Sequence, residues 1–223
     1  MAGPARGCSH DRVTPTSTAL LVVAAVLAVA DWYAVVRHDL RLEYVAKPGA
    51  TLALAATAAT LDAAHADTQV LFVVALLASL AGDVFLMLPG DRFVPGLASF
   101  FVAQVLYTIG FALHGGSGYD YLIGVIAAGV VVVPLAIRFV RAVRASGKDA
   151  LVAPVVAYMT AISAMLVTAI GSGNPFAIVG ALLFVASDAL IAETRFVGDR
   201  RHAGLAIMVT YHFAQAGLVL SLV

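Results

Sequence analysis

Cysteine and charge are both scarce in this 223-residue sequence. Cys8 is the single cysteine and lies in the polar N-terminal segment, so an intramolecular disulfide and a cysteine-based metal cluster are excluded. Charged residues make up 12% of the chain, and the 13 Lys and Arg balance the 13 Asp and Glu. This balance means that net charge says nothing about nucleic-acid or acidic partners, and we expect no nucleic-acid partner.

Apolar residues are abundant instead, at 62% of the sequence. They occur in blocks of about 20 separated by short polar loops, which is the pattern of a multi-span α-helical membrane protein. The sequence therefore predicts an all-α polytopic membrane protein, with a polar N-terminal tail at 1–16 and an eight-helix membrane domain at 17–223. The eight predicted spans cover residues 17–36, 48–62, 68–88, 93–113, 119–138, 151–170, 174–194 and 203–222.

The loop charges predict the orientation. Eleven Lys and Arg lie in or beside the loops on one side of this topology, and only Arg6 and Arg12 lie on the other. The positive-inside rule then places the basic loops in the cytoplasm and both termini outside. The span at 48–62 is rich in Ala and Thr and has the weakest signal, but omitting it would scatter the charges over both sides. A cleaved signal peptide ending near residue 30 is the alternative for the first span, and it is disfavoured because the apolar run continues into a basic loop.

Four ionisable side chains interrupt the apolar spans. Asp31, Asp83 and Asp188 each lie in the later part of a span that descends from the outside, and Lys47 precedes Pro48 at the cytoplasmic start of another. A charged group at mid-helix costs about 2.5 to 3.5 kcal/mol on insertion scales, so such residues usually face a partner, a hydrated cavity or a functional site. We expect the four to share one depth and one cavity, with Lys47 offsetting part of the acidic charge.

Two spans carry polar stripes at helical spacing. The fourth and eighth spans follow the same offsets, which suggests a parallel repeat of two four-helix units. The stripes consist of Gly96, Phe100, Gln104, Tyr107 and Phe111, and of Gly204, Met208, His212 and Gln215 with Tyr211 beside them.

Five stretches in this order carry a family resemblance: "KPGATLAL", "AGDVFLMLP", "FVPGLASFFVAQVLYTIGF", "GALLFVASDALIA" and "VTYHFAQAGLVLS". From about Lys47 to the C-terminus, apart from the stretch 130–165, which is uninformative, the chain resembles the YhhN-like family of eight-span membrane proteins, whose characterised members are lysoplasmalogenases. Two positions depart from the pattern, because many members have His where this chain has Gln104 and Tyr where it has His212. The resemblance points to Lys47, Asp83, Phe93, Gly96, Tyr107, Gly180, Phe184, Ser187, Asp188, Tyr211 and Gln215 as family positions.

The resemblance implies hydrolysis of a vinyl ether to a fatty aldehyde and a glycerophospho-alcohol. This chemistry needs a proton delivered to the alkenyl carbon and water added to the resulting oxocarbenium carbon, hence a general acid and a general base. Two carboxylates in a low-dielectric pocket can supply both roles, since burial and mutual repulsion disfavour the doubly charged state. Asp83 and Asp188 are the predicted catalytic pair, with acid and base unassigned. The predicted pocket residues are Lys47, Gln104, Tyr107, Ser187, Tyr211, His212, Gln215 and Asp31.

Other interpretations stay open for these residues. The aspartates can be structural carboxylates that bridge helices, and the polar stripe can be interhelical hydrogen bonding. Serine catalysis through Ser79 or Ser187 lacks a nearby histidine, and a metal site lacks ligands beyond His212, so we expect neither a metal nor a cofactor. A small proton- or cation-coupled transporter is the alternative function. The expected partners are a single-chain lipid substrate and membrane lipids, and the oligomeric state stays open.

Overall fold

The computed structural model describes residues 14–198 and 200–223, which form eight α-helices and one 3-10 turn, Asp149–Leu151, with no strand in those two ranges. The all-α prediction is confirmed, and each predicted span corresponds to one helix. The helices are α1 Pro15–Arg37, α2 Leu40–Thr60, α3 Ala66–Met87, α4 Phe93–Leu113, α5 Gly118–Ala145, α6 Val152–Gly171, α7 Pro175–Phe196 and α8 Ala203–Leu220.

Local sequence explains where several helices begin. Pro15 and Pro175 occupy the first turns of α1 and α7, where the missing N–H of proline costs no hydrogen bond. Asn174 caps α7 by accepting hydrogen bonds from two backbone amides of the first turn. Ser117 and Asp120 form a reciprocal capping box at the start of α5. Most of the predicted polar tail lies outside the described residues.

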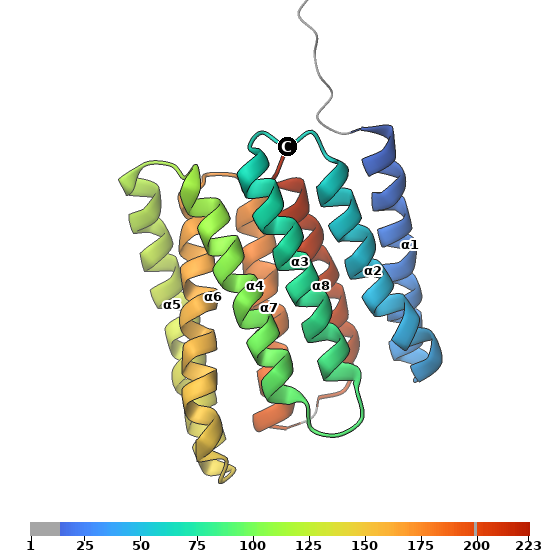
Figure 1. The fold of residues 1–223 in the computed structure, drawn as a ribbon. Coiled ribbons are helices and arrows are strands. Elements are labelled where there is room, and N and C mark those ends of the chain that lie inside the picture. Colours follow the sequence, from blue (N-terminus) through green and yellow to red (C-terminus); the bar gives the residue numbers. More distant parts are fainter. Residues whose placement is uncertain (1–13, 199) are drawn as a thin grey trace, which may run out of the picture.

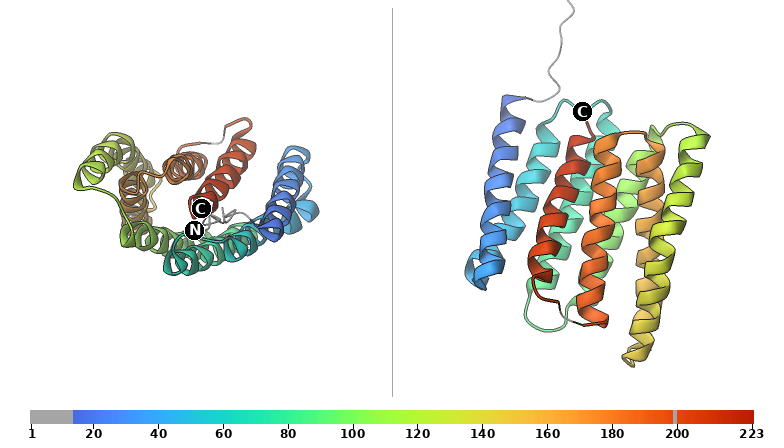
Figure 2. Two further views of the ribbon diagram at one scale, coloured as in Figure 1. Left: turned by 90° about the horizontal axis from the view of Figure 1, so that it is seen from above. Right: turned by 180° about the vertical axis from the view of Figure 1, so that it is seen from behind.

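The helices run up and down in sequence order, and the start of α1 and the end of α8 lie at the same end of the bundle (Figure 1). Seen along the helix axes, α7 and α8 lie on the concave side of an arc formed by the other six helices (Figure 2). We call the opposite end the basic end, which carries the connections at residues 38–39, 88–92, 146–151 and 197–202. Of the four ionisable residues predicted to share one depth, Asp31, Lys47 and Asp83 belong to the arc, on α1, α2 and α3, and Asp188 belongs to α7.

Seven of the eight helices are long and apolar enough to cross a membrane, and α2 is the exception. Its first eight residues include Arg41, Glu43 and Lys47, and its remainder is rich in Ala and Thr. The predicted start of this span at 48 was wrong. The helix begins eight residues earlier because Asp39 caps it through the amides of Arg41 and Leu42, and Pro48 therefore lies in its interior.

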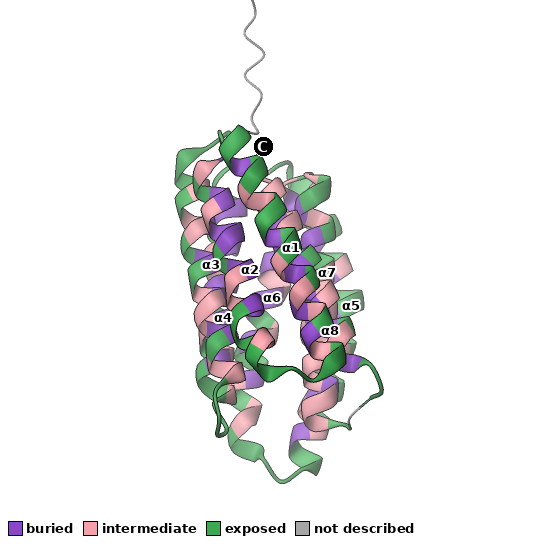
Figure 3. Cartoon of the chain, turned by 90° about the vertical axis from the view of Figure 1, so that its right-hand side faces the viewer, coloured by how far each residue is buried: buried purple, intermediate pink, exposed green. Residues whose placement is uncertain are grey.

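Small residues let the central helices approach closely. A Cβ built on Gly180 of α7 would lie 3.0 Å from the carbonyl oxygen of Ala214, and one on Gly217 of α8 would lie 3.0 Å from Cα of Gly180. Glycine at such a crossing allows the two backbones to come into contact. In a membrane, where no hydrophobic force drives helices together, this close packing stabilises their association. Buried residues lie on the inward faces of the helices and exposed ones largely outside (Figure 3).

The neighbour relations partly match the predicted repeat. In the predicted repeat, α2 corresponds to α6, α3 to α7 and α8 to α4. Helix α2 packs against α3 and α8, and α6 likewise packs against α7 and α4. The outer helices differ, because α1 contacts α8 whereas α5 contacts α7. The repeat is thus visible in the core of the bundle and lost at its edges.

Candidate active site

Asp83 of α3 is at the centre of a buried polar cluster. Its side chain is 2% exposed, and the Lys47 ammonium lies 3.4 Å from Oδ1. The hydroxyl of Thr51 donates to Oδ2 at 2.9 Å, and that of Tyr211 donates to the same oxygen at 2.7 Å. Helices α2, α3 and α8 therefore converge on one carboxylate, and all these donors favour its charged form.

A hydrogen-bonded chain continues from this cluster into the bundle. Gln215, one turn after Tyr211 on α8, donates from Nε2 to the Tyr211 hydroxyl at 3.2 Å. Tyr107 of α4 donates to Oε1 of Gln215 at 2.8 Å. All three side chains are buried. The structure thus brings together five predicted site residues, Lys47, Asp83, Tyr107, Tyr211 and Gln215, and fixes the rotation of the Tyr211 hydroxyl toward Asp83.

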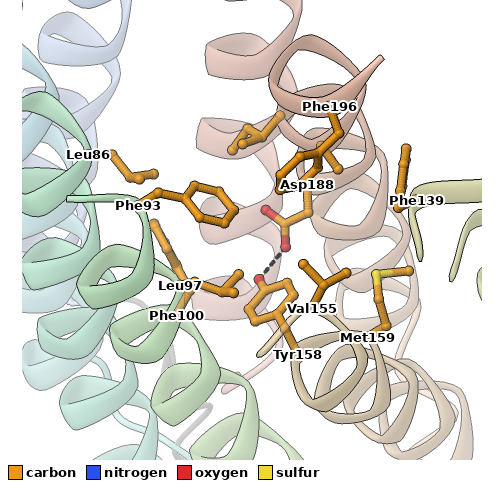
Figure 4. Close-up of a pocket in the computed structure, with 12 residues that line it drawn as sticks. Leu86, Phe93, Leu97, Phe100, Phe139, Val155, Tyr158, Met159, Asp188 and Phe196 are labelled. Carbon is orange, nitrogen blue, oxygen red and sulfur yellow. Dashed lines mark hydrogen bonds between the residues drawn. The ribbon is translucent and has the colours of Figure 1, made fainter. Parts of the chain in front are cut away.

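Asp188 of α7 belongs to a second cluster. The hydroxyl of Tyr158 on α6 donates to its Oδ2, and Gln104 of α4 donates to that hydroxyl at 3.4 Å. Asp188 lines a cavity of about 50 Å³ together with Tyr158, and the rest of the lining is apolar. Figure 4 shows the second carboxylate oxygen of Asp188 turned toward the side formed by Phe93. This arrangement places one ionisable group in the wall of an apolar pocket.

The two aspartates occupy separate clusters, contrary to the expectation of one shared cavity. The residues that line the Asp188 cavity include neither Asp83 nor Lys47 nor Tyr211. Phe100 connects the two clusters, because it lines the cavity and also packs edge-to-face on the Tyr211 ring, with centroids 6.0 Å apart. The clusters are separate because bulky aromatic rings fill the space between them. The prediction considered only the depth of each residue in the membrane and did not include these rings.

Among the described residues, three further predicted pocket residues form no hydrogen bond to either aspartate cluster, although the His212 ring lies 5.7 Å from that of Tyr211. Asp31 is fully buried on α1, and neither of its oxygens has a hydrogen-bond partner among the described residues. His212 accepts from the Trp32 indole at Nδ1, at 3.0 Å, while its Nε2 is buried without a described partner. Ser187 donates to the backbone oxygen of Ile207 at 3.2 Å. That bond joins α7 to α8, so Ser187 serves as an interhelical hydrogen-bond donor.

Sequence reasoning missed Thr51 and Tyr158. Thr51 lies one turn after Lys47 on α2, so helical spacing from the lysine was an available signal. Tyr158 lies in a stretch that carried no family resemblance, and its signal was only that of a tyrosine within an apolar span, where the hydroxyl needs a partner.

Ion pairs cross the basic end near the cavity. Glu193 of α7 accepts from Arg138 at 2.7 and 3.0 Å and from Arg200 at 2.6 Å. Arg195 forms an ion pair with Asp91 in the connection between α3 and α4, and this hydrogen bond lowers the pKa of Asp91 below its usual range. These contacts fix the end of α7, which carries Asp188 two turns away.

A possible metal-ligand set lies at the opposite end of the bundle. The ligand atoms of His65, Asp67 and His114 fall within 4.8 Å of one another on the exposed surface. The rings of His65 and His114 are stacked with centroids 3.6 Å apart, and His114 Nε2 lies 3.0 Å from both oxygens of Asp67. Parallel rings do not aim their nitrogens at one point, and the group is far from the aspartate clusters.

Comparisons with known proteins identify the family. The model of the YhhN family matches residues 42–222. A human protein named lysoplasmalogenase TMEM86B is 35% identical over 147 residues, which are 66% of this chain and 61% of that protein. A Mycobacterium tuberculosis protein named lysoplasmalogenase is 31% identical over 156 residues, 67% of this chain and 58% of its own length. The chain thus spans about 60% of the length of these relatives. No solved structure matches.

Proposed function

From the premise that this chain belongs to the YhhN family, we propose that it is an integral-membrane hydrolase that cleaves the vinyl ether bond of lysoplasmalogen-type lipids. The products are a fatty aldehyde and a glycerophospho-alcohol. The observation that carries the proposal is a carboxylate, Asp188, in the wall of an apolar cavity between α4, α6 and α7. The cavity is small, so it accommodates the first carbons of the alkenyl chain while the remainder lies in the bilayer.

The reaction balances with one water molecule. A proton bonds to the second carbon of the alkenyl chain and leaves an oxocarbenium ion at the first. Water adds to that carbon and gives up a proton. The hemiacetal then breaks its bond to the glycerol oxygen, which takes a proton, while the new hydroxyl loses its proton and becomes the aldehyde carbonyl. A site for this reaction needs one group that donates a proton and one that accepts it.

Asp188 is the proposed acid and Asp83 the proposed base. An apolar wall disfavours a charged carboxylate, and Asp188 has one hydroxyl donor, so its neutral form is favoured. Asp83 is buried as well, but the Lys47 cation and two hydroxyl donors stabilise its charged form against the cost of burial, a stabilisation that Asp188 lacks. Tyr211 connects the two, because its hydroxyl contacts Asp83 and its ring packs on Phe100 in the cavity wall. The proposed route for the proton that water loses must pass Phe100, and the Tyr211 hydroxyl, which donates to Asp83, is the last group on that route.

Aldehyde release from lysoplasmenyl-choline and lysoplasmenyl-ethanolamine tests this function. In purified protein, Asp83→Asn and Asp188→Asn should each lower kcat by roughly 10²- to 10⁴-fold, which is the usual contribution of a positioned proton-transfer group. The double variant should be little worse than the worse single one, because groups that act as a unit are not additive. Asp149→Asn, at an exposed carboxylate near the basic end, is the matched control and should keep wild-type activity. Full activity in both Asn variants would refute the assignment.

A coupled transporter, the alternative function, would be expected to have a different helix structure. Coupled transporters commonly carry interrupted helices around a midplane site. Within the described residues, each of the eight helices runs without a break. Proton-coupled uptake into vesicles that depends on Asp83 or Asp188, together with no aldehyde release by the wild type, would favour the transporter over the hydrolase.

The orientation is part of the same proposal, with the basic end in the cytoplasm and both termini outside. The support is the asymmetry of Lys and Arg between the two sets of loops. In a Cys8→Ser background, single cysteines at positions 65 and 116 should react with an impermeant reagent from outside, and one at 144 only after permeabilisation. Reaction of both sets from one side would exclude this topology.

A further inference from the structure

Arg195 of α7 lies at the basic end of the cavity with only part of its hydrogen-bonding capacity in use. One terminal nitrogen donates to Asp91, and the guanidinium carbon lies 5.1 Å from the centroid of the Phe93 ring. The Nε atom is buried and has no hydrogen-bond partner among the described residues. Since guanidinium carries five N–H donors in a fixed fork, this cation is held in place and still has donors to offer.

The position of Arg195 relates it directly to the cavity. Phe93 and Phe196 both line the cavity, and their rings meet edge-to-face with centroids 5.5 Å apart. Asp188 and Arg195 are seven residues apart on the same helix, close to two full turns, so they lie on one face about 10 Å apart along the axis. The cavity thus has a carboxyl group deep in its wall and a cation at the helix end.

This arrangement suits a ligand with an apolar chain and an anionic head. In a glycerophospholipid with one alkenyl chain, five covalent bonds separate the phosphorus from the vinyl ether oxygen. A ligand whose ether lies beside Asp188 therefore carries its phosphate to the level of the guanidinium. Phosphate oxygens lie at the membrane surface, where the last turn of a spanning helix ends, and arginine binds them with two parallel hydrogen bonds.

We propose that Arg195 binds the phosphate of the single-chain lipid substrate and that Asp91 occupies this binding position until the phosphate replaces it. This proposal rests on the proposed function and adds the recognition of the headgroup. The side chain of Asp91 is 67% exposed and that of Arg195 is 32% exposed, so the carboxylate can leave for water while the arginine stays over Phe93. An exposed ion pair of this kind contributes little stability, so exchanging its anion costs little.

Opposite effects of the two partners of the ion pair distinguish this role from a structural one. Arg195→Gln should raise KM roughly 10- to 100-fold with a small change in kcat, because it removes charged hydrogen bonds to the bound phosphate. Asp91→Asn should lower KM about two- to fivefold, because it removes the competing anion. An ion pair that only fastens the connection between α3 and α4 to α7 would give the two variants the same effect. Arg195→Lys keeps the charge and should fall between Arg195→Gln and the wild type.

The experiment combines steady-state aldehyde release with a binding measurement that needs no turnover. Lysophosphatidylcholine with an ester-linked chain lacks the vinyl ether and serves as the binding probe, and a monoacylglycerol of the same chain length serves as the phosphate-free probe. Arg195→Gln should weaken binding of the first at least tenfold and leave the second unchanged. Arg92→Gln, three residues before Pro95 and with no described contact of its side chain, is the matched control and should change neither.

The outcomes separate this inference from the proposed function. Aldehyde release with the same KM in Arg195→Gln and in the wild type overturns the inference and leaves the hydrolase standing. Binding of the phosphate-bearing probe that depends on Arg195, with no aldehyde release by the wild type, supports the inference and overturns the hydrolase. Equal loss of both probes in Arg195→Gln points to a structural role, and a lowered unfolding temperature for that variant would confirm it.

Discussion

Replacing Lys47 by methionine removes the cation from the buried pair with Asp83 and keeps a long flexible side chain in place. Both groups are almost fully enclosed, at 7% and 2% side-chain exposure, and the Nζ–Oδ1 distance is 3.4 Å. In Lys47→Met the carboxylate keeps the Thr51 and Tyr211 hydroxyls but loses its only cation within ion-pair distance among the described residues. Removing one partner of a buried pair costs about 3 to 5 kcal/mol, because the other charge stays buried.

Thermal unfolding in detergent measures this cost. For a chain of this length, 1 kcal/mol corresponds to about 2 to 4 °C, so Lys47→Met should lower Tm by roughly 6 to 20 °C. Asp83→Asn alone should also destabilise the protein, because it leaves the ammonium without its carboxylate. The double variant should recover much of the loss, since neither charge remains and the asparagine oxygen still accepts from the two hydroxyls.

The sign of the coupling decides the interpretation. A double variant as unstable as the sum of the two singles would show that Lys47 and Asp83 do not interact, and the description of the pair would be wrong. Lys148→Met changes an exposed lysine in the connection between α5 and α6 and should leave Tm within about 1 °C, because such surface changes usually cost under 0.5 kcal/mol. In activity, Lys47→Met should shift the pH optimum, because the proposed base loses its cation.

Three further changes test the packing of α7. Gly217→Ala places a Cβ 3.0 Å from Cα of Gly180 and should destabilise the protein by about 1 to 3 kcal/mol, measured by thermal unfolding; an unchanged Tm would contradict the close crossing. Ser187→Ala removes the bond to the Ile207 oxygen and should cost about 0.6 kcal/mol with kcat preserved, and a large fall in kcat would instead indicate serine chemistry. Glu193→Gln leaves two arginines without their carboxylate and should lower Tm by a few degrees, less so at high salt, where a salt-independent loss would argue against an electrostatic cause.

The sequence predicted the helices well because each span must bury about 20 residues in lipid, and that requirement leaves a strong pattern. The prediction failed where a different force decided. The start of α2 depends on a cap by Asp39 and on the Tyr44 hydroxyl, which donates to the backbone oxygen of Met87 at 2.6 Å, and neither contact has a hydropathy signal. Hydropathy therefore predicts the number of helices reliably, but it does not predict where a polar helix begins.

The structure brings together predicted residues that share a helix face or a resemblance, and it separates residues whose contact depends on how two helices meet. The chain from Tyr107 through Gln215 and Tyr211 to Asp83 joins predicted residues. The contact of Tyr158 with Asp188 depends on how α6 is rotated against α7, which one sequence does not specify. The same depth for two carboxylates gave no information on the aromatic rings around Phe100, and so the two clusters were taken as one.

The length of α5 has a practical consequence for experiments on a small membrane protein. At 28 residues it extends about 42 Å, and with α6 it projects beyond the other helices at the basic end (Figure 1). The last turns of α5 carry Arg138, Arg141 and Arg144, and Phe139 and Val143 in these turns form a buried cluster with Val155 of α6. Because this hairpin tip projects and is polar outside, a soluble helical protein fused in place of residues 146–148 would stand clear of a detergent micelle. It would give single-particle electron microscopy the asymmetric feature needed to orient the particles.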